Sequence, residues 1–182
     1  MIKFSNITSI YNEYLDILYA YALHLGFDDN TAMDAIHDVF YKLCTYNSSL
    51  QEIDNLKSYL FRSLRNRLID INRTNREITS PLLAQDDMDE FMPFNLKVTI
   101  EDEIILKENA EEIRQKIENV LNRLTERQRE IVYLRYIQEY SYEEIAEIMQ
   151  ISVLSCRNLV SKSITKLKDT SIAISLLILM IK

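Results

Sequence analysis

An all-α fold is the class that this sequence predicts, and two observations lead to it. The 182 residues include one glycine and two prolines, which is little turn chemistry for a sheet, and 47% of the residues are hydrophobic. The apolar residues recur at helical spacing along most of the chain. The formal net charge of −7, from 21 basic and 28 acidic residues, argues against a uniformly basic coat but leaves local patches open.

The first helical pattern runs from about residue 7 to residue 76 and predicts three or four helices in a domain over residues 1–79. The segment Asp28–Asn30 offers an N-cap for the second helix, and the polar residues 46–49 interrupt the pattern after it. The third run, Lys57–Glu77, holds six basic and two acidic residues, so a basic stripe exists inside an acidic protein. The apolar positions are Ile10, Tyr14, Ile17, Leu18, Tyr21, Ala32, Ile36, Val39, Phe40, Leu43, Leu56, Tyr59, Leu60, Leu64 and Leu68.

The middle of the chain has a different composition. Residues 80–112 contain both prolines and a net charge of −8, from ten acidic residues and two lysines, and we interpret them as an acidic linker that is helical from about residue 100. A second helical pattern predicts a domain over residues 113–170. Residues 171–182 form an apolar tail too short for a membrane span, which needs about 20 residues, so no membrane insertion is expected. The tail could pack in a core, clasp the two domains together, or remain an exposed sticky end.

The sequence contains no recognised catalytic or metal-binding arrangement. Cys44 and Cys156 lie far apart outside any CxxC motif, and no ligand spacing links them to His24 or His37. We therefore expect two reduced cysteines, no catalytic residue, no metal and no cofactor. The N-terminus lacks the long apolar core and cleavage site of a signal peptide, which predicts a cytoplasmic protein. The absence of a catalytic motif is consistent with a protein that is not an enzyme.

Two short helices joined by a tight turn are predicted between Ser141 and Lys168. Ser141 and Glu144 have the spacing of a capping box, which starts a helix at Tyr142, and Ser152 can cap the next helix. In the first helix, one face holds Ile145, Ala146 and Met149. In the second helix, an inward stripe comprises Cys156, Val160, Ser163 and Leu167. The opposite face comprises Arg157, Asn158, Ser161, Lys162, Thr165 and Lys166.

Residues 151–168 hold four basic residues and no acidic one, whereas a solvated helix usually mixes both signs. The pattern therefore favours a helix-turn-helix that binds DNA through phosphates and base edges. Packing of an ordinary helix pair with an accidental charge bias is the alternative at this point.

Four segments resemble extracytoplasmic-function (ECF) sigma factors of the sigma-70 family. LNRLTERQREIVYLRY, residues 121–136, and SYEEIA, residues 141–146, resemble region four of that family. AMDAIHDVFYKL, residues 32–43, and LKSYLFRSLRNRLIDINR, residues 56–73, resemble region two. The order of region two, acidic linker and region four also matches.

The sequence departs from the family pattern at several positions. Tyr59 replaces the usual Trp, and His37 replaces a Gln. Gln150 occupies the turn position that often holds Gly, and Leu154–Cys156 replaces Gly-Thr-Val at the start of the recognition helix. The last two departures bear on the promoter sequence rather than on the fold.

The resemblance implies two small helical domains and a sigma factor that directs core RNA polymerase to promoter DNA, assists melting and is held by an anti-sigma factor. A helix-turn-helix regulator that acts without replacing a sigma factor and a helical adaptor that binds protein only are the alternatives. The residues that the resemblance assigns to the downstream element and melting are Tyr59, Arg62, Arg65, Asn66, Arg67 and Arg73. Those assigned to the upstream element are Ser152, Ser155, Arg157, Asn158, Lys162 and Lys166. Those assigned to core polymerase are Asp34, His37, Asp38, Phe40 and Leu43.

Overall fold

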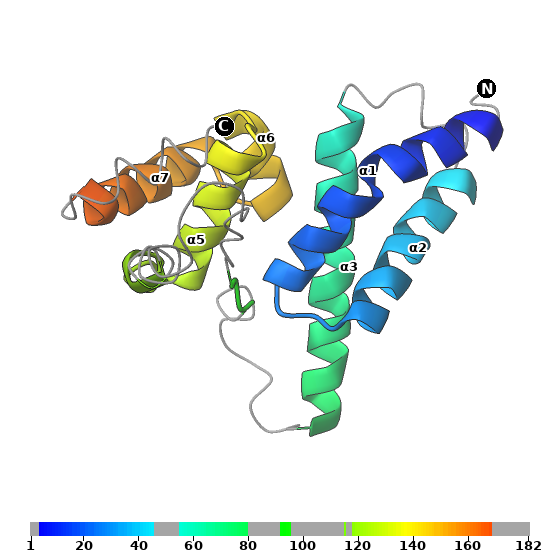
Figure 1. Cartoon of the computed structure of the whole chain (residues 1–182), viewed down its shortest axis with the longest axis horizontal. Coiled ribbons are helices and arrows are strands. Elements are labelled where there is room, and N and C mark those ends of the chain that lie inside the picture. The colour runs from blue at the N-terminus through cyan, green and yellow to red at the C-terminus, as the bar shows by residue number, and fades with distance from the viewer. Residues whose placement is uncertain (1–3, 46–54, 80–91, 96–114, 116–117, 169–182) are drawn as a thin grey trace, which may run out of the picture. The chain divides into compact units, whose positions relative to one another are not determined.

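The computed structural model describes residues 4–45, 55–79, 92–95, 115 and 118–168, and it is built of helices (Figure 1). The parts of the chain so described contain no strand, which confirms the predicted all-α fold. The acidic linker, apart from residues 92–95, and the apolar tail lie outside the described residues. In chain order the elements are α1 (Phe4–His24), α2 (Asp29–Thr45), α3 (Leu56–Thr79), α5 (Glu126–Val132), the π-helical turn η3 (Tyr133–Ile137), α6 (Tyr142–Met149) and α7 (Val153–Lys168).

The described residues divide into two compact units. The first contains α1, α2 and α3 with Met92, Pro93 and Glu147–Gln150, and the second contains α5, η3, α7, Phe94 and most of α6. In the first unit each of the three helices contacts the other two. Their apolar stripes meet between them, and the Tyr21 and Phe61 rings lie 4.9 Å apart at their centroids. The buried side chains include Leu18, Ile36, Val39, Leu60, Leu64 and Leu68, as the helical spacing predicted, and also Ala22 and Leu25.

The start of α2 is capped by Asp28, which confirms the predicted N-cap. Its carboxylate accepts the backbone N–H groups of Asn30 and Thr31, each at 3.1 Å, and the Thr31 hydroxyl at 2.7 Å. The hydrogen bond from the Thr31 side chain, followed by the one from its backbone, lowers the pKa of Asp28. Asn55 plays the same part for α3, because its Oδ1 accepts the Ser58 N–H at 3.0 Å.

The end of α1 needs the chain's one glycine. Gly26 has a φ of +83°, and the N–H groups of Gly26 and Phe27 close the helix on the carbonyls of Leu23 and Ala22 at 3.0 and 3.3 Å. A Cβ at this position would lie 2.8 Å from Cγ of Pro93. Both the backbone conformation and the available space therefore exclude a side chain here.

Gly26→Ala is expected to lower the free energy of unfolding by about 1–2 kcal/mol for the left-handed backbone alone, and further because Pro93 must shift. Urea denaturation of the full chain measures this loss. Pro93→Ala removes the obstruction, so it should restore only the part of the lost stability that is due to the steric clash. The double variant should therefore remain less stable than Pro93→Ala alone. Equal stability of Gly26→Ala and the wild type would contradict the assignment.

In the second unit α5 begins with a capping box between Thr125 and Gln128. The Gln128 N–H donates to Thr125 Oγ1 at 3.3 Å, and the Thr125 N–H donates to Gln128 Oε1 at 3.1 Å. After α5 the helix widens into η3, where the Gln138 N–H reaches the Tyr133 carbonyl five residues back at 3.1 Å. The Tyr133 ring lies 5.5 Å from Phe94, and burial raises the pKa of Tyr133 to about 12.

Candidate nucleic-acid interface

The turn between α6 and α7 has the helix-turn-helix form that the sequence predicted. The Ser141 N–H donates to Glu144 Oε2 at 2.6 Å and the Glu144 N–H to Ser141 Oγ at 3.2 Å, which confirms the capping box. The Ser155 N–H donates to Ser152 Oγ at 3.0 Å, which confirms the cap of α7. The predicted inward residues Ile145, Ala146 and Met149 of α6, and Cys156, Val160, Ser163 and Leu167 of α7, are all buried.

Gln150 has a left-handed backbone conformation in the turn, which is unfavourable for a residue with a Cβ atom. Its φ is 54°, and the Ile151 N–H closes α6 on the Ala146 carbonyl at 2.9 Å. This is the position where the family often has glycine, so the departure leaves the turn's geometry intact at an energetic cost.

We expect Gln150→Gly to raise the free energy of unfolding by about 1 kcal/mol, because glycine adopts the left-handed conformation without a Cβ penalty. Thermal and urea unfolding measure the gain. Glu147→Gly is the matched control, since this exposed residue lies in the right-handed body of α6 and its replacement should lower stability by about 1 kcal/mol. A loss of stability in both variants would refute the proposed strain at Gln150.

The exposed face of α7 carries most of the residues predicted to contact the upstream element. Arg157, Asn158 and Lys162 are exposed, on the side opposite the buried stripe. Ser152 and Ser155 are also exposed at the start of the helix, and their hydroxyls lie 2.8 Å apart. These five residues thus offer hydroxyl, guanidinium, amide and ammonium groups to a ligand.

Arg157 is held by groups on the preceding helix. Its Nη2 lies 3.5 Å from Glu143 Oε1, and its guanidinium carbon lies 5.5 Å from the centroid of the Tyr142 ring. Arg135 lies 4.7 Å from the same centroid and donates to the Tyr140 carbonyl at 2.6 Å. The Arg157 side chain is still 59% exposed, so several of its N–H groups remain available. Sequence reasoning missed this cluster, which no local motif signals.

Lys166 is exposed, as predicted, but its side chain also has a partner within the protein. Its ammonium donates to Gln128 Oε1 at 2.9 Å, the same oxygen that accepts the Thr125 N–H. The lysine therefore joins the end of α7 to the capping box of α5. We propose that Lys166 supports the fold through this bond, and its predicted contact with DNA stays a prediction.

The exposed face of α3 carries Tyr59, Arg62, Asn66 and Arg73. At about 100° per residue these four positions fall within about one sixth of the helix circumference, opposite Leu64 and Leu68. Tyr59, Arg62 and Arg73 are exposed, and Asn66 is half-buried. Tyr59, Ser63, Asn66 and Asp70 of this face line a hollow of about 170 Å³.

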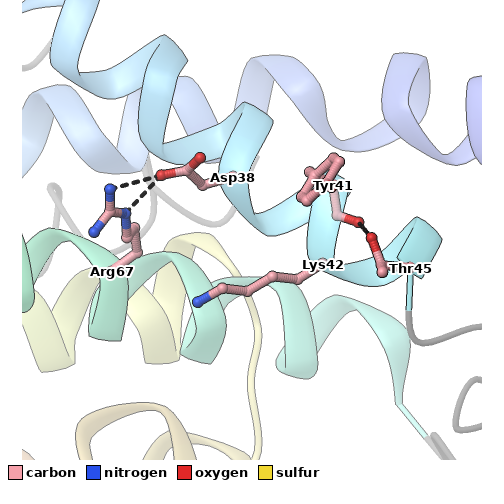
Figure 2. A pocket seen from close by; sticks show the side chains of 5 residues that line it. All are labelled: Asp38, Tyr41, Lys42, Thr45 and Arg67. Carbon is pink, nitrogen blue, oxygen red and sulfur yellow. Dashed lines mark hydrogen bonds and ion pairs between the residues drawn. The ribbon is translucent and has the colours of Figure 1, made fainter.

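Two of the arginines of α3 that were predicted to bind DNA are engaged within the first unit: one is buried and the other is paired with a carboxylate. Arg65 is 2% exposed, on the side of the helix that holds Phe61 and Leu68, so we correct its predicted role. Arg67 pairs with Asp38 of α2, with Nε and Nη2 each 2.7 Å from Oδ2 (Figure 2). Arg67 thus neutralises a residue predicted to bind polymerase. We interpret it as a link between α2 and α3.

The residues predicted to bind polymerase divide into surface and core. Asp34 and His37 are exposed and Asp38 is half-buried, so these three form a polar face of α2. Phe40 and Leu43 are 5% and 2% exposed, and we correct their predicted role because their spacing places them in the apolar stripe that faces α1 and α3. The Tyr11 hydroxyl lies 3.1 Å from His37 Nε2, and the two rings stack at 6.0 Å.

A shallow pocket of about 410 Å³ continues this polar face. It is lined by Asp38, Tyr41, Lys42, Thr45 and Arg67, and Figure 2 shows Asp38 and Arg67 facing one another between α2 and α3. Tyr41 is 72% exposed. Sequence reasoning missed Tyr41 and Lys42, although each lies one helical turn or less from a residue that it did select.

Within the described ranges, no group of three or more His, Cys, Asp or Glu side chains is arranged to hold a metal ion. Cys44 and Cys156 are free thiols, and burial raises the pKa of Cys156. None of the described helices is both long and apolar enough to cross a membrane.

Comparison with known proteins agrees with both units. Residues 10–78 match the family description "Sigma-70 region 2" and residues 114–167 match "Sigma-70, region 4". The ECF RNA polymerase sigma factor SigM of Bacillus subtilis (strain 168) is 25% identical over 89% of this chain and 93% of its own length. The RNA polymerase sigma factor SigZ of the same organism is 29% identical over 90% of this chain and 86% of its own.

The fold also matches the sigma factor RpoE of Bartonella quintana, solved in complex with the anti-sigma factor NepR. That match has a TM-score of 0.63 and 22% identity over 90% of this chain and 95% of the other. The chain belongs to the sigma-70 family, as an ECF sigma factor. The alternative of a simple helix-turn-helix regulator is not favoured, because region two is present as well as region four.

Proposed function

We propose that this sigma factor brings core RNA polymerase to its promoters through two exposed helix faces, one on α7 for the upstream element and one on α3 for the downstream element. The observation that carries the proposal is the chemistry of these two faces. In an acidic protein of net charge −7, each of them gathers cationic side chains and an asparagine on the side of the helix away from the core. Both kinds of side chain donate to phosphates and base edges.

On α7, Arg157 and Asn158 have the geometry for bidentate contacts with guanine and adenine in the major groove. Lys162 would neutralise a phosphate further along the helix. Ser152 and Ser155 lie at the helix N-terminus, where hydroxyl and backbone N–H groups favour an anion.

On α3, the melted strand needs phosphate contacts and a partner for a base that has left the stack. Arg62 and Arg73 supply the cations, and the exposed Tyr59 ring supplies a stacking surface. The Asn66 amide lies in the same hollow and can both donate to and accept from a base edge. These four residues therefore carry opening and downstream recognition in our proposal.

Core polymerase docks on the polar face of α2, formed by Asp34, His37 and Asp38, with Tyr41 beside it. We also propose an anti-sigma factor as a regulatory partner, because the structural neighbour was crystallised with one. The protein breaks no covalent bond, needs no cofactor, and acts in the cytoplasm with the polymerase. The acidic linker repels DNA and keeps the free protein from binding it tightly.

Transcription with purified core RNA polymerase tests this function. The template is a promoter library randomised over the upstream and downstream elements, and the transcripts are sequenced. We expect transcripts only when the protein is present, from a restricted set of sequences, and little binding of duplex DNA by the protein alone. Failure of the protein to change which templates are transcribed would refute the proposal.

A further inference from the structure

Leu154 is an apolar side chain in an unusual place. It lies in the first turn of α7 and is 69% exposed, whereas Cys156 and Val160 of the same helix are 0% and 3% exposed. Among the residues of α7 whose exposure the structure describes, it is the single exposed apolar side chain. Packing among the residues that the structure describes therefore does not account for a leucine at this position.

The neighbours of Leu154 on the helix surface indicate what it meets. Arg157 and Asn158 follow it at i+3 and i+4, so the three side chains are adjacent on the same outward face. Lys162, two turns on, is also exposed. A protein-docking patch needs contiguous apolar surface, and the exposed neighbours here are cationic, amide or hydroxyl groups. The surroundings favour nucleic acid over a protein partner.

The position of Leu154 in the first turn of α7 indicates which part of the DNA it contacts. The N-terminal residues of a recognition helix are those that approach base edges in the major groove. A leucine cannot bond to phosphate or to a donor or acceptor on a base, but it can cover the C5-methyl group that thymine alone presents in that groove. The chemistry of the side chain therefore selects thymine.

We propose that Leu154 is a specificity-determining residue that contacts the C5-methyl group of a thymine in the upstream element. This inference rests on the proposed function of α7. The thymine lies next to the base pair that Arg157 reads, because the two side chains are adjacent on the helix. Leu154 thereby makes this chain's promoter preference differ from that of sigma factors with glycine at the same position.

The first measurement compares wild-type and Leu154→Ala holoenzymes on the randomised promoter library. Wild type should enrich thymine at one upstream position, and the variant should lose that enrichment while keeping its other preferences. Leu23→Ala is the matched control, because Leu23 of α1 is the other exposed leucine among the described residues, and it should leave all base preferences unchanged.

The second measurement removes the methyl group alone. Deoxyuridine replaces thymine at the identified position of a selected promoter, and open complexes are counted. The number of open complexes formed by wild-type holoenzyme should fall about fourfold, which corresponds to burial of one methyl-sized group. Leu154→Ala holoenzyme should form equal numbers of open complexes on the two templates. A 5-methylcytosine at the same position should partly restore the wild-type signal.

The other possible outcomes show whether the inference about Leu154 or the proposed function of α7 is wrong. If wild type selects sequences but Leu154→Ala keeps the thymine preference, or if both respond equally to deoxyuridine, the inference is wrong and the function stands. If Leu154→Ala lowers transcription equally on all templates, Leu154 contacts protein instead. If wild type selects no upstream sequence, the proposed function of α7 fails first.

Discussion

Arg157→Ala is expected to reduce discrimination at one base pair of the upstream element by about 1–3 kcal/mol, the value of a bidentate contact with a base. The guanidinium is available for this contact, since its side chain is 59% exposed although Glu143 and the Tyr142 ring hold it from one side. The measurement is the base preference of reconstituted holoenzyme on the randomised promoter library. Permanganate footprints of templates that still open should retain the wild-type pattern, because melting belongs to α3.

Two further variants test how Arg157 works. Arg157→Lys keeps the charge but loses the planar fork, so it should lose most of the discrimination while retaining phosphate attraction. Lys166→Met is the control on the same helix, since its ammonium bonds to Gln128 and its loss should lower stability without altering any base preference. A loss of base preference in Lys166→Met comparable to that of Arg157→Ala would contradict the distinct roles assigned to the two side chains.

Asn66→Ala is expected to impair promoter opening by about 1–3 kcal/mol while leaving upstream discrimination unchanged. The amide lies in the hollow that Tyr59, Ser63 and Asp70 also line, and it can both donate to and accept from a base edge. Permanganate reactivity of thymines in the melted region, as a function of polymerase concentration, measures the defect.

A second amide on the same helix provides the control for Asn66. Asn72 Nδ2 donates to Met92 Sδ at 3.4 Å, so its side chain has a role within the first unit. Asn72→Ala should therefore change stability rather than opening. Asn66→Asp keeps an acceptor but removes both donors and adds a charge, and it should open promoters no better than Asn66→Ala. Normal opening by both Asn66 variants would exclude the proposed contact.

Local chemistry predicted the features that depend on neighbours along the chain. Asp28, Ser141 and Ser152 were recognised as helix caps because their oxygen atoms bond to N–H groups two or three residues away. The stripe from Cys156 to Leu167 was predicted because helical periodicity alone determines which side chains share a face. The cap of α5 at Thr125 was missed, although its Thr-x-x-Gln spacing carries the same signal.

Periodicity by itself did not separate a surface arginine from a buried one. Arg65 lies one position after Leu64 on the edge of the apolar stripe of α3, and the packing of the unit covers it to 2% exposure. Phe40 and Leu43 were assigned a binding role by resemblance even though they fit the same stripe as Ile36. The spacing argument was the better guide for these two residues, because an apolar stripe is buried wherever helices pack.

By itself, the sequence determined the all-α class, the caps, the helix-turn-helix, the inward stripes and the family. Each of these follows from contacts within about one turn of helix or from motifs along the chain. Only the tertiary structure decided which charged groups are engaged with one another: Arg67 with Asp38, Lys166 with Gln128, and Arg157 with Tyr142 and Glu143. These pairs join residues 29, 38 and 14 or 15 positions apart, and a long cationic side chain reaches whichever acceptor the packing of helices brings near.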